Sequence, residues 1–210
     1  LAMLGQVHGQ SPITTLDWVG TSMGGLIGII MCGQPGLPLP VPVRKLVLND
    51  VGPAIQWQAL VRIGQYLGMA GEFESVQAAA DAMWSVSIGF GPHTSDQWLA
   101  LSQHMVKPVS DAPGSKYRLH YDPAMAIPFR QSTEEATQQG AAALWQLYDN
   151  IKAQTLLIRG ATSDLLNPET AQAMTERGPR ATLVEFAGVG HAPTLIAGDQ
   201  VAAVTGFLLG

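Results

Sequence analysis

A serine stands between glycines in the segment Gly20-Thr21-Ser22-Met23-Gly24, a spacing typical of a nucleophilic serine. A short strand is predicted before it, at 16–19, and an apolar helix after it, at 26–32. Glycines at positions 20 and 24 would permit a sharp turn from strand to helix, where side chains would collide. The turn places the serine at a helix N-terminus, where backbone N–H groups face an anionic intermediate. Ser22 is therefore the predicted nucleophile, and the Met23 N–H a predicted oxyanion donor.

A serine hydroxyl is a poor nucleophile at neutral pH and needs a base. Among the five histidines, His191 stands out because it lies in a glycine-rich segment, 188–193, just after the last predicted strand. Such a loop places its side chains at the carboxyl edge of a parallel sheet, where sites form. His93, His104 and His120 are expected to have surface or packing roles. His8 lies too close to the serine to belong to a separate oxyanion loop.

The base in turn needs a carboxylate to orient it. Asp164 follows the predicted strand 154–159 and precedes His191 by 27 residues, enough for one helix and one strand. Asp50 follows an earlier predicted strand, 43–49, and would lie at the same edge of the sheet. The order serine, acid, histidine along the chain and the loop after the strand favour Asp164, with Asp50 as the alternative. Asp17 precedes the serine within its strand and is a poor candidate.

These residues require a parallel sheet to position them. Strands are predicted at 16–19, 43–49, 154–159 and 181–186, with helices at 26–32, from Asn167 to about Gly178, and from Asp199 to about Leu209. Near-continuous apolar strands alternating with helices indicate an α/β protein with a doubly wound, mostly parallel sheet.

The middle of the chain has a different pattern, of amphipathic helices separated by glycine and proline. Thr94 with Gln97 and Ser132 with Glu135 fit capping boxes. Asp122 followed by proline fits a helix N-cap, and the segment 116–121 is predicted to be extended. The chain is therefore expected to hold a helical insert between two α/β segments.

Composition excludes several other classes of protein. Of the 210 residues, 47% are hydrophobic and 13% charged, and the net charge is −5, which favours a globular protein over a disordered one. No basic patch interleaved with aromatic residues suggests a nucleic-acid partner, and no apolar run is long enough to span a membrane. Cys32, the single cysteine, excludes an internal disulfide and a multi-cysteine metal site. These features, without a recognisable signal peptide, favour a cytoplasmic location.

Three motifs in this order resemble those of the α/β-hydrolase superfamily: the turn at 20–25, the acid loop at 159–164 and the histidine loop at 188–192. The segment 46–53 also resembles the strand that leads into the cap of such enzymes. The resemblance implies a triad of Ser22, Asp164 and His191, and hydrolysis through an acyl-enzyme with no metal or organic cofactor. It further implies a core at 1–52 and 151–210, with a helical cap at 53–150 over the pocket.

The resemblance also implies several strands ahead of the strand that carries the serine. One of their loops would supply the second oxyanion N–H. Only 21 residues precede Ser22, so we expect the chain to be the C-terminal part of a longer protein. If it is complete, poor stability and little catalysis are expected.

Relatives of this kind include small bacterial carboxylesterases, lactonases and C–C bond hydrolases. We predict an esterase acting on a small or medium apolar ester, with lactone or C–C bond hydrolysis as the alternative within the same chemistry. A non-catalytic ligand-binding member or an inactive fragment is the alternative of another class. Arg62, Arg118 and Arg130 are candidates to hold a substrate carboxylate, or else are surface residues. Apolar and aromatic residues expected to line the pocket or to pack between helices are Trp57, Met69, Trp84, Phe90, Trp98, Met105, Tyr121, Phe129, Trp145 and Tyr148.

Overall fold

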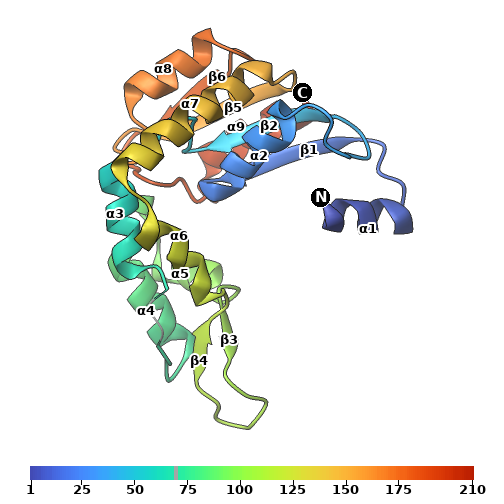
Figure 1. The fold of residues 1–210 in the computed structure, drawn as a ribbon. Coiled ribbons are helices and arrows are strands. Elements are labelled where there is room, and N and C mark those ends of the chain that lie inside the picture. Colours follow the sequence, from blue (N-terminus) through green and yellow to red (C-terminus); the bar gives the residue numbers. More distant parts are fainter. Residues whose placement is uncertain (69–70) are drawn as a thin grey trace.

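The computed structural model describes residues 1–68 and 71–210, and within them four parallel strands form the central sheet in the order β1-β2-β5-β6 (Figure 1). The predicted α/β architecture with a parallel sheet is confirmed. The strands and helices of this part are α1 (Ala2–Gln10), β1 (Leu16–Thr21), α2 (Met23–Gly33), β2 (Val43–Asn49), α7 (Glu134–Asn150), β5 (Gln154–Gly160), α8 (Pro168–Glu176), β6 (Thr182–Phe186) and α9 (Gly198–Leu209).

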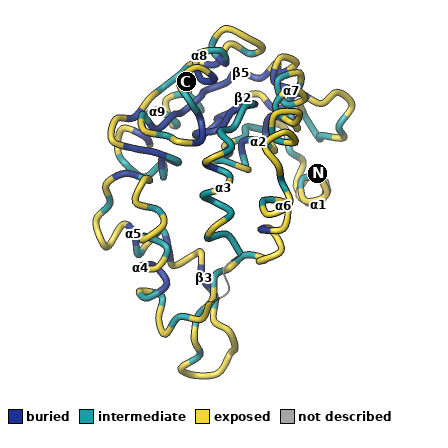
Figure 2. Tube along the Cα trace, turned by 60° about the vertical axis from the view of Figure 1, so that its left-hand side comes forward, coloured by how far each residue is buried: buried dark blue, intermediate teal, exposed yellow. Residues whose placement is uncertain are grey.

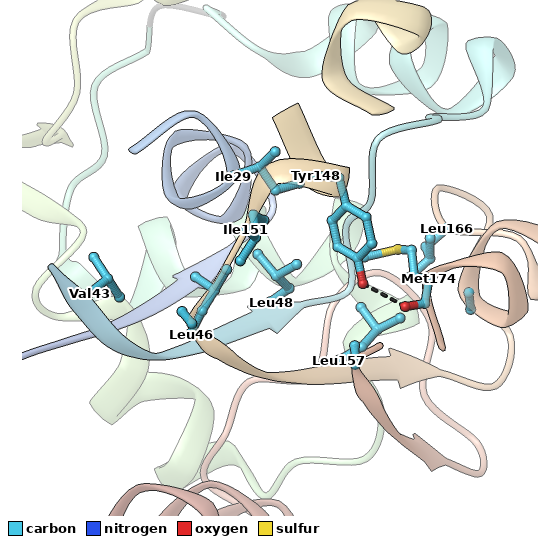
Figure 3. Packing of buried hydrophobic residues seen from close by; sticks show 12 residues of the cluster. Ile29, Val43, Leu46, Leu48, Tyr148, Ile151, Leu157, Leu166 and Met174 are labelled. Carbon is cyan, nitrogen blue, oxygen red and sulfur yellow. Dashed lines mark hydrogen bonds between the residues drawn. The ribbon is translucent and has the colours of Figure 1, made fainter. Parts of the chain in front are cut away.

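Helices cover both faces of the sheet because successive side chains of a buried strand point to opposite sides. On one face, Leu46, Leu48 and Leu157 pack with side chains of α2, α7 and α8 (Figure 3). On the other face, Val47 and Ile158 pack against α9. Each of these strand residues is fully buried, which stabilises the fold by about 2 kcal/mol per side chain relative to exposure.

A second group of elements forms an arm that extends away from the sheet (Figure 1). Its surface is largely exposed, with only short buried stretches (Figure 2). Its two short strands pair antiparallel with each other and not with the central sheet. The elements are α3 (Trp57–Tyr66), α4 (Val76–Val86), a 3₁₀ helix at Ile88–Phe90, α5 (Ser95–Ser102), β3 (Val106–Pro108), β4 (Tyr117–Leu119), a 3₁₀ helix at Pro123–Met125, and α6 (Ala126–Gln131).

Helix α7 joins the arm to the sheet layer. Its second half packs into the main core cluster, where Tyr148 is fully buried and its hydroxyl donates to the Met174 carbonyl at 2.7 Å (Figure 3). The second half of α7 thus contributes to the core of the sheet layer. Of the residues expected to line the pocket or pack between helices, Trp145 and Tyr148 pack in this core cluster. Met69 lies outside the described residues.

The ends of the helices test the predicted capping residues. Thr94 and Gln97 form the predicted capping box of α5, and Asp122 accepts a hydrogen bond from the Ala124 N–H ahead of the 3₁₀ helix. The box predicted at Ser132 is wrong: Thr133 caps α7, and the Ser132 hydroxyl donates to the Pro128 carbonyl instead. Asp199, the predicted start of the last helix, lies in the first turn of α9, where a carboxylate interacts favourably with the helix dipole.

Cys32, in the apolar helix α2, packs against the main core cluster. Burial raises the pKa of its thiol to about 11. Among the described residues, no helix is both long and apolar enough to cross a membrane.

Candidate active site

The chain turns sharply at Ser22, between the end of β1 and the start of α2. Ser22 has a φ of 51°, in the left-handed region, where an L-residue other than glycine is strained. A Cβ on Gly20 would lie 2.3 Å from the Gly24 carbonyl oxygen, so only glycine fits there. At Gly24 a Cβ would meet nothing within 4 Å, and it is Gly25 whose Cβ would collide with Val51. The steric requirement predicted for Gly24 therefore belongs to Gly25.

A side-chain hydrogen bond from Trp18 in β1 stabilises the turn. The indole Nε1 donates to the Gly24 carbonyl at 2.9 Å. Gly28 leaves room for this ring, because a Cβ there would lie 2.8 Å from Trp18 Cδ1. Met23 is the first residue of α2, so its N–H is one of those that a helix leaves without an intrahelical acceptor.

Three residues from distant parts of the sequence form one hydrogen-bonded chain. Ser22 Oγ lies 3.0 Å from His191 Nε2, and His191 Nδ1 lies 2.7 Å from Asp50 Oδ2. The tautomer that fits has its proton on Nδ1, donating to the carboxylate, and leaves Nε2 free to accept from the hydroxyl. Asp50 is fully buried and the His191 side chain is 9% exposed. This is the arrangement in which an imidazole can take a proton from a serine hydroxyl.

The structure corrects the expectation that Asp164 is the carboxylate that orients His191. Asp164 forms an ion pair with Arg62, with Oδ2 2.7 Å from Nε and Oδ1 2.9 Å from Nη2. Asp50 takes the position beside the histidine because it directly follows β2, which lies between β1 and β5 in the sheet. The alternative that sequence reasoning left open is thus the one that the structure places on His191.

The Asp50 carboxylate is fixed by groups at the end of β5 and in the loop that follows it. The Gly160 N–H donates to its Oδ1 at 2.8 Å, and the Ser163 hydroxyl donates to its Oδ2 at 2.6 Å. The Ser163 oxygen also accepts from the Leu165 and Leu166 N–H groups, which fixes the hydroxyl itself. The predicted acid loop therefore contributes to the site by holding the acid rather than by supplying it.

Asn49 joins the serine turn to the histidine loop, a role that was not predicted from the sequence. Its buried amide Nδ2 donates to Thr21 Oγ1 at 2.9 Å and to the Pro193 carbonyl at 2.8 Å. Because Thr21 and Pro193 lie next to Ser22 and close to His191, this amide fixes the distance between the two loops. Asparagine in the last position of a buried strand is the only signal that sequence offered.

The arm contacts the histidine loop directly. The Gly190 N–H donates to the Gly89 carbonyl, and His93 Nε2 lies 2.8 Å from Thr194 Oγ1. His93 also lies edge-on to the rings of Trp84 and Trp98. The expected packing role of His93 is therefore a contact between arm and core.

A cleft of about 280 Å³ lies where arm and core meet beside His191. Its walls include Arg62 and Asp164, the hydroxyl residues Ser85, Ser87 and Thr162, and the apolar residues Val86 and Ile88. None of the aromatic residues predicted to line the pocket is among the described residues of this cleft. Its lining is therefore more polar than the sequence suggested.

The three candidate arginines lie in different places. Arg62 lines the cleft with His191, Arg118 lines a separate hollow at the far end of the arm, and Arg130 donates to the Leu67 carbonyl. Within residues 1–68 and 71–210, no group of three or more His, Cys, Asp or Glu side chains is placed to hold a metal ion.

Comparisons with known proteins agree with this geometry. The model of the alpha/beta hydrolase family matches residues 3–204. The chain is 46% identical over 198 residues to a 3-hydroxybutyrate-oligomer hydrolase of Cupriavidus necator, an alignment that covers 94% of this chain and 66% of that protein. The chain thus spans slightly less than two thirds of the length of this relative.

Solved structures give the same result. A protein of Rickettsia typhi described as a hydrolase superposes with a TM-score of 0.80 at 25% identity, over 99% of this chain and 67% of that one. An alpha/beta hydrolase of Novosphingobium aromaticivorans superposes with a TM-score of 0.76 at 29% identity, over 98% and 69%. The family match over nearly the whole chain, the fold and the sharp turn at Ser22 lead to one conclusion: the chain belongs to the alpha/beta hydrolase family.

Proposed function

We propose that this chain is the catalytic part of an ester hydrolase in which Ser22 is the nucleophile, His191 the general base and Asp50 the orienting acid. The observation that carries the proposal is the hydrogen-bonded series from Ser22 Oγ through His191 to the buried Asp50 carboxylate, at 3.0 and 2.7 Å. These three side chains come from three separate loops at one edge of the sheet.

The reaction follows from this arrangement in two steps. His191 Nε2 accepts the Ser22 proton as the oxygen attacks the ester carbonyl, and then gives that proton to the departing alcohol. Water attacks the resulting acyl-enzyme in the same way, with His191 again as the base. Asp50 stabilises the imidazolium that forms in each step. The Met23 N–H, at the positive end of α2, donates to the oxyanion.

The proposed substrate is a short ester of a hydroxy acid rather than a strongly apolar ester. Two observations support it. The relative at 46% identity carries the name 3-hydroxybutyrate-oligomer hydrolase, and the cleft beside His191 is small and lined by hydroxyl and charged groups. Pockets for drug-sized ligands range from about 300 to 1,000 Å³, so a cleft of about 280 Å³ suits a compact substrate.

A fluorophosphonate probe tests the proposal, because it reacts only with an activated serine. We expect covalent labelling of the folded chain at Ser22, seen as a mass increase on the peptide that contains it. The Ser22→Ala variant should not be labelled, and Ser11→Ala, at an exposed serine after α1, serves as the matched serine control. Hydrolysis of 3-hydroxybutyrate dimers and of simple esters of increasing chain length then defines the substrate. A folded chain that is neither labelled nor active would favour a ligand-binding role instead.

A further inference from the structure

The ion pair between Arg62 and Asp164 uses only one side of the guanidinium group. Asp164 engages Nε at 2.7 Å and Nη2 at 2.9 Å, which is a side-on pair. Nη1 has one partner among the described residues, the Tyr66 hydroxyl, at 3.4 Å. An arginine carries five N–H donors in a planar fork. The edge formed by Nη1 and the second Nη2 hydrogen can therefore still bind a second carboxylate in bidentate fashion.

Arg62 is placed where a substrate carboxylate would be needed. It lines the same cleft as His191, whose Nε2 contacts Ser22. Within the described residues, it is the one lysine or arginine side chain on the walls of this cleft. Asp164 raises the pKa of the Arg62 guanidinium through their hydrogen bonds, so the group stays charged. Its side chain is 39% exposed and therefore accessible to a ligand.

We propose that Arg62 binds the carboxylate of an acidic ester substrate and that Asp164 holds the guanidinium in position for it. The inference deepens the proposed function: a linear oligomer of a hydroxy acid ends in a carboxylate, which lies only a few bonds from the ester it adjoins. Arg62 therefore sets the preference for acid-terminated oligomers over neutral esters. Charge-assisted bidentate bonds of this kind are the strongest hydrogen bonds in proteins.

The alternative role for this pair is a latch between arm and core, since Arg62 lies in α3 and Asp164 in the loop after β5. The two roles predict different consequences for the two partners. A latch is broken equally by removing either charge. A carboxylate site is lost with Arg62 but improved by Asp164→Asn, because the amide oxygen still accepts from the guanidinium while the repulsion between Asp164 and the incoming anion disappears.

Binding measurements on the Ser22→Ala chain separate these roles without depending on turnover. The ligands are the 3-hydroxybutyrate dimer and the same dimer with its carboxylate converted to an amide. Isothermal titration calorimetry gives a Kd for each, and we expect the acid to bind ~10-fold more tightly than the amide. Arg62→Gln should weaken binding of the acid by ~10- to 100-fold and leave the Kd of the amide within ~2-fold.

Two further variants make the result specific. Asp164→Asn keeps one hydrogen-bond acceptor for Arg62 and removes the negative charge, so the acid should bind ~2- to 5-fold more tightly. Arg62→Lys keeps the positive charge but lacks the planar guanidinium. Its Kd for the acid should lie between those of the parent and of Arg62→Gln. Thermal melts followed by circular dichroism confirm that each variant is folded.

The proposal is overturned if the parent shows no preference for the acid, or if Arg62→Gln and Asp164→Asn weaken both ligands alike. Failure of the proposed function is read separately, from fluorophosphonate labelling at Ser22. A chain that is labelled but shows no dependence on Arg62 keeps its esterase role and loses this site. A chain that is not labelled but binds the acid through Arg62 keeps the site and loses the esterase role.

Discussion

Asp50 and Asp164 follow neighbouring parallel strands, β2 and β5, and reach the same edge of the sheet. Their surroundings differ completely. Asp50 is fully buried and has three partners, the Gly160 N–H, the Ser163 hydroxyl and His191. Asp164 has a side chain that is 46% exposed, and its side-chain partner within residues 1–68 and 71–210 is Arg62. The order of strands in the sheet, rather than position in the sequence, therefore decides which carboxylate binds His191.

The larger expected effect is that of Asp50→Asn on ester hydrolysis. The amide keeps the shape of the side chain but cannot accept a hydrogen bond from His191 through its nitrogen, so the wrong tautomer is favoured. Turnover should fall by about 10⁴-fold, the loss typical of this change in a serine triad. The measurement is kcat for a short ester, with Ser22→Ala as the inactive reference. Retention of more than a tenth of the activity would remove Asp50 from the triad.

Gly160→Ala is expected to have the next largest effect on ester hydrolysis. It disturbs the residue whose N–H holds the Asp50 carboxylate and leaves the side chain of Asp164 unchanged. A Cβ at this position would lie 2.3 Å from the Gly190 carbonyl oxygen and 2.5 Å from that of Val189. Both atoms are backbone in the histidine loop, so the loop must move. A displacement of about 1 Å can cost about 100-fold in rate, and overpacking costs about 1–3 kcal/mol of stability.

Urea denaturation and kcat on the same preparation of Gly160→Ala measure these two losses. Gly24→Ala is the matched control, since a Cβ there meets nothing within 4 Å. Equal losses of kcat and stability in the two variants would show that replacing a glycine, and not the contact with the histidine loop, causes them.

Ser163→Ala removes one of the donors that hold Asp50, together with the acceptor of the Leu165 and Leu166 N–H groups. One hydrogen bond contributes about 0.5–1.5 kcal/mol, so kcat should fall by about 10-fold with KM unchanged. Ser163→Thr, which keeps a hydroxyl, should restore most of the activity. Loss of activity through KM alone would mean that Ser163 acts on substrate binding and not on the orientation of Asp50.

Much of the sheet could be predicted because its signals are local. The strand at 43–49 has the predicted bounds, and the turn at Ser22 was predicted from its glycines and the elements around it. Apolar runs bounded by glycine and proline predict strands from the local sequence alone. The fold class therefore followed from the sequence, as did the proximity of Ser22 and His191 to one edge.

The identity of the acid could not be predicted, because it depends on which strands become neighbours. Asp50 and Asp164 lie 114 positions apart, and both satisfy the rule of a carboxylate after a strand. Only the pairing of β2 with both β1 and β5 places Asp50 between Ser22 and the loop of Ser163. The steric need for glycine was predicted at position 24 instead of 25 for the same reason. A Cβ on Gly25 would collide with Val51, which follows the neighbouring strand β2.

The smallest expected effect is that of Asp164→Asn on a neutral ester. Exposed ion pairs contribute about 0–1 kcal/mol to stability, and Asp164 contacts neither Ser22 nor His191 among its hydrogen bonds. The melting temperature should change by a few degrees at most, and kcat on a neutral ester should stay within about 3-fold of the parent.

Asp164→Asn is therefore the matched control for Asp50→Asn. The two substitutions are the same chemical change, made at the ends of two strands that pair with each other. If Asp164→Asn were instead to abolish turnover while Asp50→Asn did not, the hydrogen bonds of His191 would have to differ during the reaction from those of the resting protein. A wide gap in kcat between the two variants, with Asp50→Asn far lower, assigns the role of the acid to the buried carboxylate.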